Sequence, residues 1–318
     1  MTAASSSKVP EKIMSRERAK RRRAGATSAG TMGPTLLFLL PITAVVIGLY
    51  AWPLAQALVY SFTDYRALGS ETHFVALANY RKIFSDPSML TGLGFTVMFT
   101  VFVTLFTTLL AIPLAVVLNI KFMGNKVARA LFFFLGVPSQ AIIGLVWQYI
   151  FSPLNTGALN SVLAKLNLPT ALWLADPTLA RWCIIFVAVW SGVGWHATLY
   201  LAYLQAIPQD LYEQSLVDGA NPVQQFFHIT LPQLTPAITV STFLLVTGGL
   251  KIYDLPYAMT GGGPGVATNT VTQQIILQGV SQGNYGVGSA LSMLFLTISV
   301  VIVLLQVWVV RIMSRRFA

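Results

Sequence analysis

The chain has 318 residues, of which 55% are hydrophobic and only 9% are charged. Soluble globular proteins carry roughly 25% charged residues, so this chain has too few charges to solvate the surface of a soluble protein of its size. Its charges are also clustered, and several stretches without Asp, Glu, Lys or Arg exceed the ~20 residues that cross a bilayer as a helix. The composition therefore excludes a soluble protein and indicates an all-α, polytopic membrane protein.

The net charge of +10 does not indicate a nucleic-acid partner, because eight of the twenty basic residues lie in the first 23 positions. A basic N-terminal tail of this kind holds the adjoining segment in the cytoplasm and attracts anionic lipid headgroups. We expect no cleavable signal peptide, since the apolar run after Arg23 is too long for one. The single cysteine, Cys183, excludes an intrachain disulfide.

Six apolar segments predict six transmembrane helices. Their expected bounds are 35–61, 93–119, 130–151, 182–203, 237–258 and 288–310. With the N-terminus inside, the four cytoplasmic segments hold fourteen Lys and Arg residues and the three outer segments hold five. This asymmetry satisfies the positive-inside rule, so we expect both termini in the cytoplasm. The domain organisation is then a basic cytoplasmic tail, 1–34, followed by a transmembrane domain, 35–318.

Small residues interrupt two of the predicted spans. Gly192 and Gly194 lie in the fourth span, and Gly248 and Gly249 lie in the fifth. Such glycines either permit close contact between helices or mark a break in a helix that lines a cavity. The sequence leaves both interpretations open and favours packing.

The cytoplasmic segment 204–236 does not follow the topology pattern, since it holds no Lys or Arg and three acidic residues. Pro208 and an acidic first turn favour a helix of about two turns, which Gly219 would end in a left-handed conformation. A turn at Asn221-Pro222 leads into a second helix, expected to end at Leu231-Pro232 before the membrane. The pattern predicts a short helix–turn–helix that projects from the membrane domain.

This loop resembles the EAA loop of binding-protein-dependent ABC importer permeases. The resemblance rests on Glu213, Gly219 six residues later, and the group Ile229-x-Leu231-Pro232, with Gln214-Ser215 in place of the usual Ala-Ala. Two further segments resemble permeases of the maltose and glycerol-3-phosphate type. They are Tyr253 to Tyr257 followed by Thr260-Gly261-Gly262-Gly263-Pro264, and Trp190-x-Gly192 upstream of Leu204 to Pro208. The resemblance covers residues 35–318 and implies a type I ABC importer permease fold.

The resemblance implies that the loop 204–236 docks on an ATPase subunit. The implied ATPase-coupling residues are Glu213, Asp218, Gly219, Ile229, Leu231 and Pro232. Glu213 would make polar contacts at the joint, Gly219 would permit the turn, and Asp218 would cap or orient the loop. The chain has no phosphate-binding Gly-x-x-x-x-Gly-Lys-[Ser/Thr] segment, so ATP and Mg are expected in a partner ATPase, with no cofactor or metal in this chain.

Polar and aromatic residues within the spans are candidates for a substrate path, since polar groups in hydrocarbon mostly face a cavity. The expected path residues are Trp190, Gly192, Trp195, Thr247, Gly248 and Lys251. Trp190 and Trp195 lie about 140° apart on a regular helix and would stack on one face only if the helix were unwound between them. His196 is more typical of a hydrogen-bonded packing residue. Lys251 either pairs with Asp254 three residues later or contacts the solute.

The expected function is one permease of a heteromeric ABC sugar importer in the cell (inner) membrane. Its expected partners are a second permease, two ATPase subunits, an extracytoplasmic binding protein, a sugar and membrane lipid. A permease for an amino acid, a peptide, a polyol phosphate or a metal is the alternative. A secondary transporter or a membrane enzyme fits less well, because the spans hold few ionisable groups and no nucleophile–base arrangement.

Overall fold

The computed structural model describes residues 38–68, 71–120 and 122–317, and the predicted basic tail, 1–34, lies outside these ranges. The chain divides into two units, residues 1–56 and 57–318. The described part of the first unit belongs to an apolar helical run, Phe38–Tyr60, which contains the π-helical turn η1 (Ile47–Ala51) and ends in α2 (Trp52–Tyr60). This run corresponds to the first predicted span.

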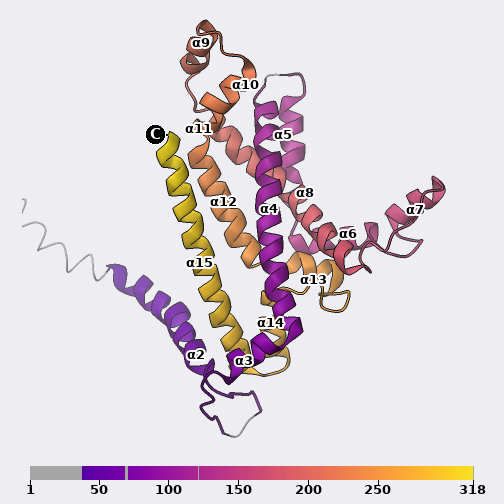
Figure 1. Ribbon diagram of the computed structural model, residues 1–318, viewed down its shortest axis with the longest axis vertical. Helices are drawn as coiled ribbons and strands as arrows, with labels where there is room; N and C mark the ends of the chain where they lie inside the picture. Colours follow the sequence, from indigo (N-terminus) through magenta and orange to yellow (C-terminus); the bar gives the residue numbers. More distant parts are fainter. Residues whose placement is uncertain (1–37, 69–70, 121, 318) are drawn as a thin grey trace, which may run out of the picture. The chain divides into compact units, whose positions relative to one another are not determined.

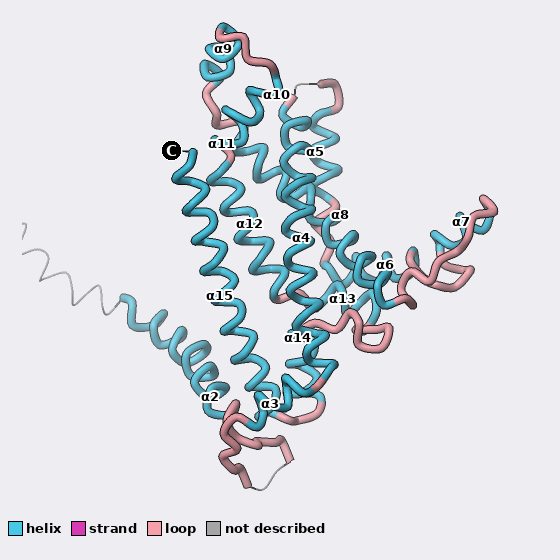
Figure 2. Tube along the Cα trace, in the orientation of Figure 1, coloured by secondary structure: helices cyan, strands magenta, loops and turns pink. Residues whose placement is uncertain are grey.

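The second unit is a set of helices joined by loops (Figures 1 and 2). Its elements are α3 (Ala78–Ser85), α4 (Pro87–Asn119), α5 (Asn125–Phe134), α6 (Gln140–Ile150), α7 (Ala158–Lys165), α8 (Pro177–Leu204), α9 (Gln209–Val217), α10 (Pro222–Gln225), η2 (Phe226–Thr230), α11 (Leu231–Gln233), α12 (Thr235–Leu250), α13 (Asp254–Thr260), α14 (Val271–Ile275), η3 (Ile276–Ser281) and α15 (Tyr285–Phe317). Over the described ranges the only β pairing is one isolated bridge, between Thr63 and Phe74. The all-α prediction is confirmed for this part of the chain.

Four helical runs in the described chain are long and apolar enough to cross a membrane: Phe38–Tyr60, Pro87–Asn119, Pro177–Leu204 and Tyr285–Val309. A fifth is added if the bent pair Pro222–Gln233 and Thr235–Leu250 is counted as one span. The protein is therefore a multi-pass membrane protein, with four or five such spans in the part of the chain that the structure describes.

The third predicted span, 130–151, is not one continuous helix. Its residues form the end of α5 and all of α6, with a break at 135–139. Pro138 disfavours helical geometry in the residue before it, and the Ser139 hydroxyl then accepts a hydrogen bond from the Ile142 amide (3.4 Å) as the cap of α6. An apolar run without charges hides such a break, because its hydropathy is the same on both sides.

The fifth predicted span, 237–258, is also interrupted. Helix α12 ends at Leu250, and α13 begins at Asp254 after three non-helical residues. Lys251 is the C-cap of α12 and lies at the break itself.

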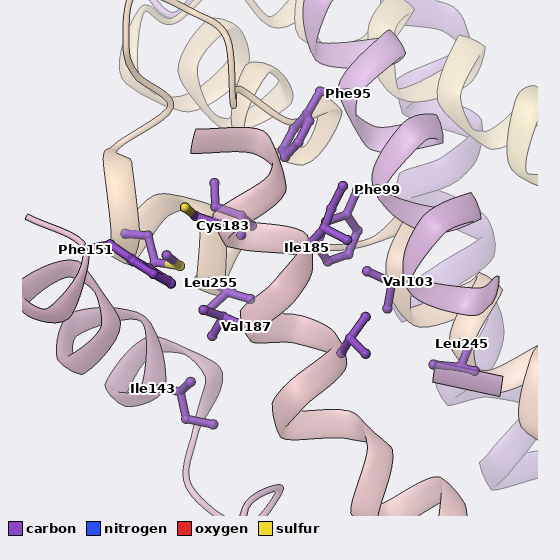
Figure 3. Packing of buried hydrophobic residues seen from close by; sticks show 13 residues of the cluster. Phe95, Phe99, Val103, Ile143, Phe151, Cys183, Ile185, Val187, Leu245 and Leu255 are labelled. Atoms are coloured by element: carbon purple, nitrogen blue, oxygen red, sulfur yellow. The ribbon is translucent and has the colours of Figure 1, made fainter. Parts of the chain in front are cut away.

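Helix α4 forms the centre of the second unit, where it packs mainly against α8 and α12. One hydrophobic cluster joins α4, α6, α8, α12 and α13, and Figure 3 shows Phe99 of α4 beside Ile185 of α8 within it. A second cluster joins the other half of α4 to the end of α8 and to Leu234 and Ala237. This second cluster holds the end of α8 and the start of α12, between which the loop 204–236 runs.

Candidate functional site

The loop 204–236 forms a helix–turn–helix, as the sequence predicts, and its helices lie together at one end of the second unit (Figure 1). Helix α9 starts after Pro208 and has Asp210 in its first turn. It ends in a Schellman motif, in which the Gly219 amide donates to the Leu216 carbonyl (3.1 Å) and the Ala220 amide donates to the Ser215 carbonyl (2.9 Å). Gly219 has φ +77°, the left-handed geometry expected for it.

The returning helix begins with a capping box at Asn221. The Asn221 side chain accepts from the Gln224 amide (2.9 Å), and the Gln224 side chain accepts from the Asn221 amide (2.8 Å). Asp218 is the C-cap residue of α9, and its expected role in capping or orienting the loop stays a prediction. Its side chain is exposed and makes no hydrogen bond among the described residues, and the N-cap of the returning helix is Asn221.

The returning helix runs from α10 through the π-helical turn η2 into α11, and it ends at Gln233 rather than at Leu231-Pro232. Pro232 lies in α11, near the end of this continuous run. The run Pro222–Gln233 is bent by 64° against α12. The loop therefore joins the membrane helix through a bend and not through a flexible linker.

Side-chain hydrogen bonds link the two helices of the loop. The Tyr212 hydroxyl and Thr230 Oγ1 lie 2.9 Å apart, and Gln225 Nε2 donates to Ser215 Oγ over 2.9 Å. Sequence reasoning missed both bonds, since neither spacing nor composition signals a contact between residues ten or eighteen positions apart.

The six predicted coupling residues divide between the two sides of the loop. Glu213, Asp218 and Gly219 are exposed on α9 and its turn, whereas Ile229, Leu231 and Pro232 are half-buried on the returning helix. Exposed apolar side chains accompany the acidic residues: Leu216, Val217, Val223 and Phe227. A mixed acidic and apolar surface of this kind is suited to contact with another protein.

A glycine-rich turn follows α13. Gly261 ends α13 with φ +61°, Gly262 has φ +98°, and Gln273 Nε2 donates to the Gly261 carbonyl over 2.8 Å.

Helix α8 is continuous through Gly192 and Gly194, so it is not unwound between Trp190 and Trp195.

The two tryptophans of the predicted path consequently have different surroundings. Trp190 packs edge-on against Trp147 of α6, with ring centroids 5.2 Å apart. Trp195 is 41% exposed in this chain and lies against the ring of its neighbour His196. His196 is buried, and its Nδ1 lies 2.7 Å from Ser241 Oγ of α12, which confirms its role as a hydrogen-bonded packing residue.

Thr247 and Lys251 line a hollow of about 260 Å³ between α12 and α15, together with Ser299 of α15. Lys251 is exposed and forms no ion pair with Asp254, since the described residues contain one ion pair only, between His73 and Glu71. The break after Leu250 separates the two side chains, so the expected i,i+3 pair does not form.

Residues 95–316 match the family model described as "Binding-protein-dependent transport system inner membrane component". The chain belongs to this family. A trehalose/maltose transport system permease protein, MalF, of Thermococcus litoralis is 33% identical to this permease over 273 residues, covering 85% of the chain and 92% of the relative. A probable ABC transporter permease protein, YurN, of Bacillus subtilis is 32% identical over 274 residues, covering 85% and 93%.

A solved bacterial alginate ABC transporter, in complex with an alginate pentasaccharide-bound periplasmic protein, contains a chain of similar fold. The TM-score is 0.79 at 20% identity, covering 91% of this permease and 97% of that chain. The likeness shows the fold of an ABC importer permease. The permease is therefore a membrane-embedded transporter subunit, with the ATPase activity in partner subunits.

Proposed function

We propose that this permease forms, with a second permease, the translocation path for a sugar or sugar-like solute delivered by an extracytoplasmic binding protein. Two separate ATPase subunits close on ATP and drive the change between inward-open and outward-open states through the loop 204–236. The helix–turn–helix of this loop, attached to α8 at one end and to α12 at the other, is the observation that carries the proposal.

The loop has the features that mechanical coupling requires. Its outer helix, α9, has no buried residue and presents Glu213 and Asp218 to a partner. Its returning helix packs Phe226 and Leu231 against the cluster that holds the end of α8 and the start of α12. A displacement at α9 is therefore applied next to two helices of the membrane core.

The sugar class is supported by the relatives, which include the trehalose/maltose permease of Thermococcus litoralis and a multiple sugar-binding transport system permease of Streptococcus mutans. The proposed path residues are Trp190, Gly192, Trp195, Thr247, Gly248 and Lys251. Tryptophan rings accept the apolar faces of sugar rings, and the lysine and threonine side chains are donors for sugar hydroxyls. The proposed topology has six spans with both termini in the cytoplasm, in line with the distribution of Lys and Arg.

The proposal is tested with the complete importer in proteoliposomes. We expect uptake of maltose or a related oligosaccharide that requires both ATP and the binding protein, with no uptake of a free amino acid such as methionine. Glu213→Ala and Gly219→Val should lower uptake and sugar-stimulated ATP hydrolysis without loss of the permease from the membrane. Uptake driven by an ion gradient without ATP, or unchanged coupling in both variants, would contradict it.

A further inference from the structure

Helix α9 is attached to the rest of the permease by few contacts. None of its residues is buried, and no other helix of the described chain packs extensively along it. Its covalent connections are the short segment 205–208 before it and the Gly219 turn after it. A force applied to such a helix would tilt it locally unless side chains tie it to its neighbour.

The returning helix, by contrast, is firmly anchored. Phe226 and Leu231 pack against the cluster that contains Leu204 and Leu234, and Thr230 is 7% exposed. The helix then continues through the 64° bend into α12. Any group that fixes α9 to the returning helix therefore fixes it to the membrane core.

Two side-chain hydrogen bonds provide this attachment. Tyr212 and Ser215 lie three residues apart and so share one face of α9. Their partners are Thr230 and Gln225, at 2.9 Å in each case. The π-helical turn Phe226–Thr230 brings these two partners onto the same side, because a π turn stacks residues five apart.

Ser215 stands where the family's usual sequence has alanine, and in this permease its hydroxyl has a specific partner. It donates to the Tyr212 carbonyl (2.7 Å) while it accepts from Gln225. The bonds are partly buried, so water competes with them less than on an open surface.

We propose that Tyr212, Ser215, Gln225 and Thr230 form a polar clasp that makes α9 and the returning helix move as one body. They are positioning residues: they act through α9, which meets the ATPase, and through α12, which moves with the returning helix. This inference rests on the proposed function of the loop as a coupling joint and adds the residues that make the joint stiff.

The first test measures sugar imported per ATP hydrolysed by the complete importer in proteoliposomes. Tyr212→Phe and Thr230→Val should each lower this ratio, because loss of one ordinary hydrogen bond lowers the population of the loop with its two helices joined, relative to the separated state, about fivefold. The double variant should fall no further than Thr230→Val alone, because both changes remove the bond between the two helices, and Thr230→Val removes besides it only the 3.4 Å bond to the Gln225 carbonyl of its own helix. Thr230→Ser keeps the hydroxyl and should retain the wild-type ratio.

Tyr203→Phe is the matched control, since it removes a tyrosine hydroxyl from α8 that makes no hydrogen bond to another described residue. A ratio for Tyr212→Phe equal to that of Tyr203→Phe, or additive losses in the double variant, would overturn the clasp. Equal recovery of assembled complex for all variants separates a loss of coupling from a loss of folding.

The second test does not depend on transport. Cys183 is the only cysteine and is buried, so Cys183→Ala with Val217→Cys and Val240→Cys places one spin label on α9 and one on α12. In the assembled importer, with partner subunits that lack cysteine, we expect a narrow distribution of label distances. Tyr212→Phe combined with Gln225→Met should broaden it.

An unchanged distribution would refute the clasp, whatever the importer transports. An importer that carries no sugar but shows the broadening would refute the proposed solute and leave the clasp standing. The two failures are therefore distinguishable.

Discussion

Glycines on α8 and α12 show how a single missing Cβ decides which helices touch. A Cβ on Gly194 would lie 1.9 Å from the Phe132 carbonyl oxygen, and one on Gly249 would lie 3.0 Å from Thr100 Oγ1. Gly192 and Gly248, in contrast, have no neighbouring atom within 4 Å of that position. Gly194 and Gly249 are therefore required for helix packing, whereas Gly192 and Gly248 face open space. The latter two are the glycines proposed for the substrate path.

This difference predicts that alanine substitutions at Gly192 and Gly194 of α8 have opposite effects on the stability of the permease. Gly194→Ala forces α8 away from α5 and should cost about 1–3 kcal/mol, as overpacked cores do. Gly192→Ala meets no atom and should slightly stabilise the helix, because alanine is the better helix former. Thermal unfolding of the purified permease in detergent checks both. Equal melting temperatures for the two variants would show that the close approach of α5 and α8 is absent.

Asp86 caps the first turn of α4 and predicts a pH dependence at that end of the helix. Its carboxylate accepts from the Ser88 hydroxyl (2.6 Å) and the Ser88 amide (2.8 Å), and these bonds lower the pKa of Asp86 below its usual 3.8. A carboxyl group whose pKa is depressed on folding stabilises the fold above its unfolded pKa and loses that effect as the pH falls through the folded value.

Asp86→Ala should therefore destabilise the permease by about 1 kcal/mol at pH 7, the usual effect of removing an N-cap. The difference in melting temperature between wild type and variant should shrink as the pH is lowered below 3.8. Asp176→Ala, which removes the equivalent cap of α8, serves as a comparison at the same pH values. If the difference in melting temperature between wild type and Asp86→Ala stayed constant down to pH 3, the ionised Asp86 carboxylate would not be what stabilises this helix end.

At the scale of helices, α8 and α12 are the two elements that the loop 204–236 joins, and a hydrogen bond connects them within the apolar region. His196 of α8 and Ser241 of α12 are both buried and lie 2.7 Å apart. Hydrogen bonds between membrane helices contribute about 0.6 kcal/mol on average and up to about 1.7. Here the bond also fixes how the two helices meet below the loop.

Ser241→Ala should lower the melting temperature by about 2–4 °C, since it leaves the His196 ring nitrogen without its partner in an apolar setting. Thr239→Val is the matched control on the same helix, because the Thr239 hydroxyl bonds only to the Thr235 carbonyl of its own helix. Both variants are measured by thermal unfolding in the same detergent. Equal shifts would mean that the contact between α8 and α12 adds nothing to stability.

At the scale of the whole molecule, the features that can be predicted from the sequence are those that neighbouring residues along the chain determine. Charge gaps located the apolar spans, and Gly219 and Asn221-Pro222 located the turn of the loop. The break at 135–139 contains Pro138 and Ser139, and the break after Leu250 lies between Lys251 and Asp254. Apolar residues on both sides keep the mean hydropathy of each stretch high, so hydropathy alone does not show that the helix ends there. The bonds Tyr212–Thr230 and His196–Ser241 join residues 18 and 45 positions apart, and only the packed structure brings these together.

The arrangement of the whole unit also separates the two tryptophans of the proposed path. Trp190 is part of the cluster that joins α6 to α8, so Trp190→Ala removes packing and should lower the melting temperature.

Trp195 is 41% exposed in the single chain, and Lys251 is exposed beside the hollow between α12 and α15. Trp195→Ala and Lys251→Ala should leave the melting temperature nearly unchanged and raise the KM for sugar uptake several-fold, because a contact with solute is lost while coupling is kept. Asp254→Asn is the control for Lys251, since the two side chains form no ion pair, and it should change neither value. The KM values are measured as uptake kinetics in proteoliposomes. An unchanged KM in both the Trp195 and the Lys251 variants would place the sugar path on another face of the permease.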